Sequence, residues 1–162
     1  MRNSVISLHR SLRRMALSAV FALLVQSGFG VAVNLYTSIP KHHSGANPSN
    51  YLTGSFHSVL WSIVHGTSSL VIHAVLGILL VLMSISIVVK AFSLRSTSIT
   101  IWSVLGLLFI VGAGFNGASF LDYNKNVSSL VMALLTFGAI ACYVIITYLL
   151  GTPDWRHHYD KG

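Results

Sequence analysis

His73 is the residue whose type and position most strongly suggest chemistry. It lies a few residues inside a long apolar stretch, and an ionisable side chain within a membrane span is rare, costly and by default a functional candidate. With a helical rise of about 1.5 Å per residue, we expect His73 to lie roughly 8 Å below the outer membrane edge. Two roles stay open: a ligand or proton-relay group, or a neutral imidazole hydrogen-bonded to a neighbouring helix.

A helix that continues unbroken from residue 55 would align polar and small residues on one slowly turning stripe. Its members are His65, Ser69, His73 and Gly77. His65 and His73 would lie about 12 Å apart along the axis, too far to bind one metal ion together. This continuous helix is the alternative to a break or bend at Gly66 and Thr67, which we expect before the span that starts at residue 68.

Polar residues predicted at a similar depth suggest a pocket. Asn116 lies near the outer end of a later apolar stretch, and Gln26 lies in the middle of the first one. We predict an outer-facing polar pocket lined by His73, Asn116, His65, Ser69, Tyr36 and Asp122. The alternative is interfacial capping with a belt of tyrosines. We expect Gln26 to hydrogen-bond between helices, or else to line a solute path.

Histidines in the loop after the first stretch suggest a metal site. Imidazole suits zinc and copper, and His42, His43 and His57 are close in sequence. Their spacing contains neither HxxxH nor HExxH, and no cysteine or carboxylate accompanies them. A metal site that uses these residues or His73 is therefore kept as a hypothesis, beside pH sensing.

The histidines also invite comparison with bacterial b-type cytochromes, which hold haem between membrane helices. Leu8-His9-Arg10 resembles the Leu-His-Trp start of that family, with Arg10 in place of the tryptophan. A bis-histidine haem needs a second histidine on a facing helix, but residues 15–36, 98–121 and 127–150 contain none. The chain is not assigned to this family, and haem b on His73, with a loop histidine opposite, is an alternative hypothesis.

Glycines in the third stretch form the string Gly112-Ala-Gly-Phe-Asn-Gly117. The string matches GxGxxG, but a dinucleotide site also requires a preceding strand and a following soluble helix. In an apolar helix small residues let neighbouring helices approach closely. We therefore predict that packing, not a ligand, explains Gly112, Gly114, Gly117 and Gly77.

The charged residues exclude several classes of function. The acidic residues are Asp122, Asp154 and Asp160, and the chain has no glutamate. With so few carboxyl groups, we do not expect acid–base catalysis by a pair of carboxylates. The single cysteine, Cys142, excludes an intrachain disulfide and a CxxC redox pair. A net charge of +7 would suit nucleic acid, but the basic residues flank apolar stretches. We expect no nucleic-acid partner and no enzymatic activity.

Four apolar stretches must position all of these residues. The chain is 54% hydrophobic with a mean hydropathy of +0.75, and about 20 apolar residues suffice to cross a bilayer. We predict an all-α membrane protein, a single four-helix bundle, with spans at residues 15–36, 68–92, 98–121 and 127–150. The short connector at residues 122–126 predicts that the last two spans are antiparallel neighbours.

The segments outside the spans are also predicted from composition. Residues 1–14 are basic and suit a surface helix, and residues 151–162 form a polar tail. Residues 37–67 contain helix-breaking Pro and Gly, then an interfacial helix from Phe56 to His65 anchored by Trp61. One face of that helix carries Phe56, Val59, Leu60, Ile63 and Val64. The other face carries His57, Ser58, Ser62 and His65.

Orientation follows from the basic residues beside the spans. The two ends of the chain and the connector from Lys90 to Arg95 hold eight of the ten lysines and arginines. We therefore predict a protein of the cell membrane with both ends cytoplasmic. The leading functional hypothesis is a non-enzymatic accessory subunit or binding module, with a membrane-protein partner or a second copy of the chain. The alternatives are a haem- or quinone-linked electron-transfer protein that uses His73, and a small transporter or channel component.

Overall fold

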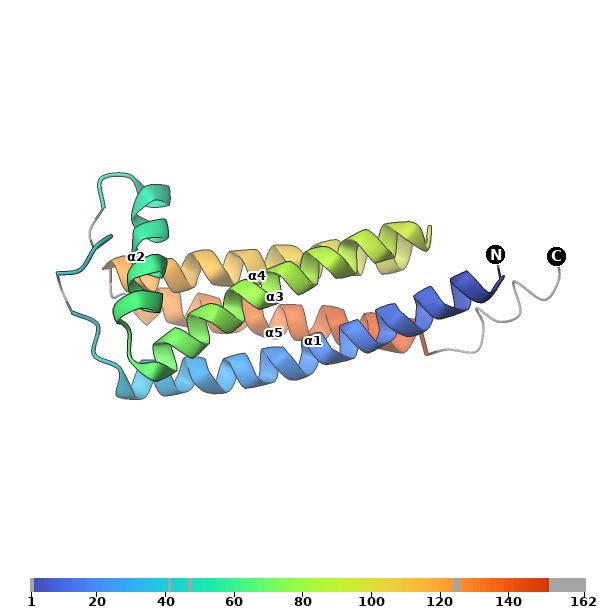
Figure 1. The fold of residues 1–162 in the computed structure, drawn as a ribbon, viewed down its shortest axis with the longest axis horizontal. Coiled ribbons are helices and arrows are strands. Elements are labelled where there is room, and N and C mark those ends of the chain that lie inside the picture. Colours follow the sequence, from blue (N-terminus) through green and yellow to red (C-terminus); the bar gives the residue numbers. More distant parts are fainter. Residues whose placement is uncertain (1, 41, 47, 124–125, 152–162) are drawn as a thin grey trace.

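A computed structural model describes residues 2–40, 42–46, 48–123 and 126–151. Four long helices run side by side: α1 (Arg2–Tyr36), α3 (Ser68–Ser93), α4 (Thr97–Tyr123) and α5 (Asn126–Leu149) (Figure 1). The short helix α2 (Tyr51–His65) lies across one end of this bundle. No strand occurs among the described residues.

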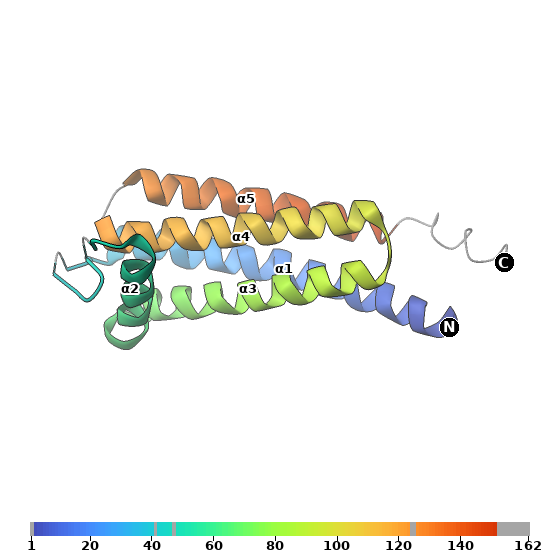
Figure 2. The same ribbon diagram turned by 90° about the horizontal axis from the view of Figure 1, so that it is seen from above.

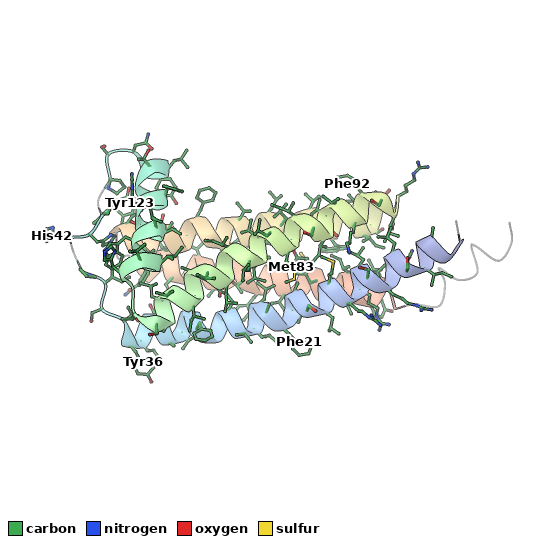
Figure 3. All side chains as sticks on the ribbon, in the orientation of Figure 1. Phe21, Tyr36, His42, Met83, Phe92 and Tyr123 are labelled. Carbon is green, nitrogen blue, oxygen red and sulfur yellow. The ribbon has the colours of Figure 1, made fainter. Side chains whose placement is uncertain are left out.

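The long helices confirm the four predicted apolar elements. Each is long and apolar enough to cross a membrane, and large apolar side chains such as Phe21 and Phe92 point away from the bundle (Figure 3). The antiparallel pairing of α4 and α5 is also confirmed (Figure 2). The basic segment before residue 15 is not a separate helix, because α1 continues through it without a break. Leu12 and Ala16 are fully buried there, so packing against the bundle extends into the basic segment.

The ends of the bundle differ in chemistry. The end that carries α2, here called the α2 end, holds Asp122, the one acidic residue in the described part of the chain. The opposite end, here called the basic end, is formed by the start of α1, the connector between α3 and α4, and the end of α5 (Figure 1). Its described basic side chains are Arg10, Arg13, Arg14, Lys90 and Arg95.

Helices α1 and α3 pack in a heptad register. Buried or half-buried positions repeat at alternating spacings of four and three residues, the pattern of a coiled-coil seam. In α1 they are Leu12, Ala16, Ala19, Leu23, Gln26, Gly30 and Val33; in α3, taken in the opposite direction, they are Ala91, Ile87, Ser84, Leu80, Gly77, His73 and Leu70. The two series stay in step, so His73 lies against Gly30 of α1 and Gln26 lies against Gly77 of α3.

Helices α4 and α5 repeat this arrangement. The seam of α4 contains Ser103, Gly106, Ile110, Ala113 and Gly117; that of α5 contains Ile146, Tyr143, Ala139, Thr136 and Met132. A Cβ atom at Gly106 would lie 2.9 Å from Cζ of Tyr143, and one at Gly117 would lie 3.2 Å from Sδ of Met132. The glycines of α4 thus admit large side chains of α5, as expected for small residues at a membrane-helix interface.

Helix α2 begins and ends at recognisable signals. The side chain of Asn50 caps its first turn by accepting a hydrogen bond from the Thr53 backbone N–H at 3.2 Å. The helix therefore starts five residues before the predicted Phe56. It ends at His65, and extended backbone at Gly66 and Thr67 separates it from α3. His65 and His73 consequently lie on different helices, and the stripe that assumed one continuous helix does not form.

Candidate functional site

Gln26 of α1 and His73 of α3 form a polar pair between two apolar helices. The Gln26 amide donates to the His73 backbone carbonyl at 3.0 Å, and its nitrogen lies 3.4 Å from Nε2 of the His73 ring. The expected interhelical hydrogen bond of Gln26 is confirmed. Its partner on α3 is His73, which it contacts at both the backbone carbonyl and the ring.

The geometry assigns the protons of this pair. Only the NH₂ group of Gln26 can donate to a carbonyl, so this hydrogen bond fixes which way the amide points. The second N–H then faces Nε2 of His73, which acts as the acceptor and leaves the proton of a neutral ring on Nδ1. Neither Nδ1 of His73 nor Oε1 of Gln26 has a hydrogen-bond partner, and both atoms are buried. The pair therefore offers one unused donor and one unused acceptor inside an apolar region.

Two glycines hold this pair in place. A Cβ atom at Gly30 would lie 3.1 Å from Cε1 of the His73 ring, and one at Gly77 would lie 3.4 Å from Nε2 of Gln26. Each polar side chain therefore rests against the bare backbone of the facing helix. Gly77 belongs to the predicted packing set, whereas Gly30 was not singled out from the sequence.

Three other predicted pocket residues form no hydrogen bond with this pair. Asn116 donates to the Gly112 carbonyl of its own helix at 2.9 Å. Tyr36 is 82% exposed and points away from the bundle (Figure 3). Ser69 joins Thr37 and Thr67 in a hydroxyl cluster, with oxygen–oxygen distances of 3.1 to 3.3 Å. Asn116 therefore bonds within its own helix, whereas Ser69 bonds to residues beside the ends of α1 and α3.

Asp122 is the most unusual polar residue of the α2 end. Its side chain is only 2% exposed. Oδ2 accepts a hydrogen bond from the Ser55 hydroxyl of α2 at 3.0 Å, whereas Oδ1 has no partner. A buried carboxylate oxygen without a partner is costly. Asp122 and Ser55 thus join α4 to α2 through a carboxylate that retains free acceptor capacity.

His43 and Trp61 close the α2 end beside Asp122. The His43 ring stacks on Trp61 with ring centroids 4.5 Å apart, and its Nε2 lies 3.1 Å from the Leu121 carbonyl oxygen. Trp61 also packs on the small apolar cluster of Val33, Leu70 and Leu121. A shallow hollow of about 190 Å³ adjoins them, lined by Ser44, His57, Leu60, Trp61, Val64 and His65. Three histidines of the loop and α2 thus lie in or beside one hollow.

Helix α2 turns its serines inward and its large apolar side chains outward. Ser55, Ser58 and Ser62 are buried against the bundle. Phe56, Leu60 and Val64, on the opposite side, are 68%, 48% and 64% exposed. The small serines permit close approach, and the backbone of Gly45 packs against Ser58, where a Cβ would overlap its hydroxyl. Gly45 also has a φ of +99°, a conformation that favours glycine.

The residues proposed for metal or haem are spread over the structure. His43 contacts Trp61, His57 lies in α2, and His73 lies on α3. Among the described residues, no three His, Cys, Asp or Glu side chains come together in a way that could hold a metal ion. The metal and haem hypotheses stay predictions.

The glycines of the third stretch that were predicted to serve packing occupy different surroundings. A Cβ at Gly112 would lie 3.2 Å from Cδ1 of Leu135 on α5, whereas one at Gly114 would meet no atom within 4 Å. Of the residues that reasoning from sequence missed, Ser55 had a signal: it precedes Ser58 by three residues and Ser62 by seven, and so continues their face of the helix. Gly30 had one too, four residues after Gln26.

Comparisons with known proteins identify no relative of this chain. No protein-family model, curated protein or solved structure matches this chain. Its function must therefore be argued from its own residues.

Proposed function

We propose that this protein is an accessory subunit or binding module of the cell membrane that engages a neighbouring membrane protein through its α2 end. The observation that carries the proposal is the outward-facing apolar side of α2. A helix that packs on a bundle normally buries its apolar face, but α2 buries serines and exposes Leu52, Phe56, Leu60 and Val64. This face suits an apolar segment of a partner.

The bundle below α2 supports the same proposal. The hydrogen bond between Ser55 and Asp122 and the stacking of His43 on Trp61 hold α2 and the preceding loop against α3 and α4. The exposed apolar face of α2 therefore lies on a helix that these contacts already hold in place. The partner gains contact area without the entropic cost of ordering α2 on binding.

Purification in mild detergent tests this function. We expect a stoichiometric membrane-protein partner to co-purify with the unaltered chain and to be lost from a Phe56→Ser, Leu60→Ser double variant. The matched control is Leu130→Ser, Phe137→Ser, which removes exposed apolar side chains from α5. A monodisperse single chain, or equal loss of the partner in both double variants, would contradict the proposal and leave α2 with a lipid contact alone.

The orientation that goes with this function has both ends of the chain cytoplasmic and α2 in the outer interfacial region. Its support is the concentration of lysine and arginine at the basic end. Because Cys142 is the only cysteine, a Cys142→Ser chain accepts single reporter cysteines. An impermeant maleimide added to intact cells should label Ser44→Cys, and Ser93→Cys only after lysis. The reverse pattern would invert the orientation.

A second candidate function, electron transfer linked to haem or quinone, rests on His73. The unused Nδ1 donor and the neighbouring Oε1 acceptor of Gln26 lie inside the apolar region, where an unsatisfied polar group is costly. An absorbance spectrum of protein expressed with added haem decides the haem branch. A Soret band that disappears in His73→Ala would support it, and a colourless protein would remove it.

A further inference from the structure

A groove between α1 and α5 opens at the basic end of the bundle. Its volume is about 510 Å³. Helix α1 contributes Arg13, Leu17 and Val20, and the end of α5 contributes Val144, Thr147, Tyr148 and Gly151. The start of α1 and the end of α5 lie at the same end of the bundle (Figure 1). The proposed partner face of α2 lies at the other end of the molecule.

The groove is polar at one end and apolar along its length. Leu17 and Val20 follow Arg13 by four and seven residues, so they lie about 6 and 10 Å further along the helix axis. They share the groove with Val144 of α5. The Thr147 hydroxyl is occupied, since it donates to the Tyr143 carbonyl at 2.8 Å. The groove thus has the Arg13 cation at one end and apolar side chains along the rest of its length, which runs toward the middle of the membrane.

Gly151 positions the guanidinium of Arg13 at the end of α5. A Cβ atom at residue 151 would lie 3.2 Å from Nη2 of Arg13, so a larger residue would push the guanidinium away. The partial negative charge of a helix C-terminus favours a cation there. A guanidinium has five N–H donors and is always charged, so Arg13 retains donors for an anion.

Charge around the groove selects the kind of ligand. Arg10, Arg14, Lys90 and Arg95 lie at the same end, and the described part of the chain has no carboxylate there. Basic pockets between membrane helices bind the head groups of anionic lipids. A neutral lipid would make only the apolar contacts, and a free phosphate would make only the charge interaction with Arg13.

We propose that the groove between α1 and α5 binds one anionic phospholipid, with its phosphate on Arg13 and an acyl chain along Leu17, Val20 and Val144. This site does not depend on the proposed function of the α2 end. It also does not depend on which side of the membrane the basic end faces.

Native mass spectrometry of the full chain in detergent, with phosphatidylglycerol or phosphatidylcholine added, tests the proposal. We expect one phosphatidylglycerol to be retained at least about tenfold more strongly than phosphatidylcholine. Arg13→Gln should remove this preference. Arg14→Gln, an equal change of charge on the neighbouring residue, should keep retention within about twofold. Gly151→Ala keeps every charge but displaces the guanidinium, and it should weaken retention severalfold.

Two results would overturn the site. Equal losses in Arg13→Gln and Arg14→Gln would show general attraction of an anionic lipid to a basic surface. Equal retention of the two lipids by the unaltered chain would show that the groove holds an acyl chain without selecting a head group. Arg13→Lys serves as the second variant if Arg13→Gln does not fold, and it should retain a reduced preference because the charge stays while the forked geometry is lost.

Discussion

The amide of Gln26 donates to the backbone carbonyl of His73 across the contact between α1 and α3, at 3.0 Å. One hydrogen bond thereby fixes the direction of the amide and the proton position on the ring. It also joins the first span to the third helix of the chain by a polar contact inside an apolar seam. A change that removes this hydrogen bond should therefore affect both the stability of the seam and which ring nitrogen of His73 carries the proton.

Replacing Gln26 by leucine should lower the stability of the bundle. The change removes an interhelical hydrogen bond, which in membrane proteins contributes about 1 kcal/mol or less, and leaves Nε2 of His73 without its donor. Ser27→Ala is the control, because the Ser27 hydroxyl bonds only to the Leu23 carbonyl of its own helix. Unfolding in detergent measures both effects. ¹⁵N spectra of His73 should show Nδ1 protonated in the unaltered chain; protonation at Nε2 would contradict the assigned geometry.

Gly30→Ala and Gly28→Ala should differ although both lie on α1. The new methyl group at residue 30 would lie 3.1 Å from Cε1 of His73, whereas at residue 28 it would meet no atom within 4 Å. We expect Gly28→Ala to be neutral or stabilising, since alanine favours helix over glycine by up to about 1 kcal/mol. Gly30→Ala should be less stable than Gly28→Ala by about 1–3 kcal/mol, the usual cost of overpacking. Equal unfolding free energies would rule out the contact of His73 with Gly30.

A second glycine pair tests the seam between α4 and α5. A methyl group at Gly106 would approach Cζ of the fully buried Tyr143 to 2.9 Å, whereas Gly114 faces open space. Gly106→Ala should destabilise the bundle by about 1–3 kcal/mol, and Gly114→Ala should leave it unchanged. Thermal unfolding in detergent compares the two variants. If Gly114→Ala proves the more damaging, the heptad register assigned to α4 is wrong.

The serines of α2 should respond in opposite directions. Ser55→Ala removes the one hydrogen bond that the Asp122 carboxylate accepts among the described residues, so the buried acceptor loses this partner, at a cost of about 1–3 kcal/mol. Ser58 is equally buried, but its hydroxyl has no partner, so Ser58→Ala should be neutral or stabilising. Hydrogen exchange of α2 amides measures the local effect. Equal protection in the two variants would contradict the link between α2 and α4.

The apolar elements and their neighbours along the chain follow from local properties. Length and hydropathy place four helices because a bilayer requires about 20 apolar residues in succession. The short connector predicted at residues 122–126 made the last two spans antiparallel neighbours, since so few residues cannot span the bundle. The break at Gly66 and the interhelical hydrogen bond of Gln26 were also predicted from the sequence, each as one of two alternatives.

The sequence by itself thus determined which segments are helices and that His73 needs a partner. Only the tertiary structure decided that the partner is Gln26 and not Asn116, because the heptad registers of two helices far apart in the chain determine which residues face each other. The direction of α2 was also decided there. His57 and His65, predicted on the same side as the serines, are exposed. Periodicity shows that α2 has two unlike sides, but the fit of Ser55 against Asp122 of α4 and of Ser58 against Gly45 of the loop decides that the serines are the buried residues.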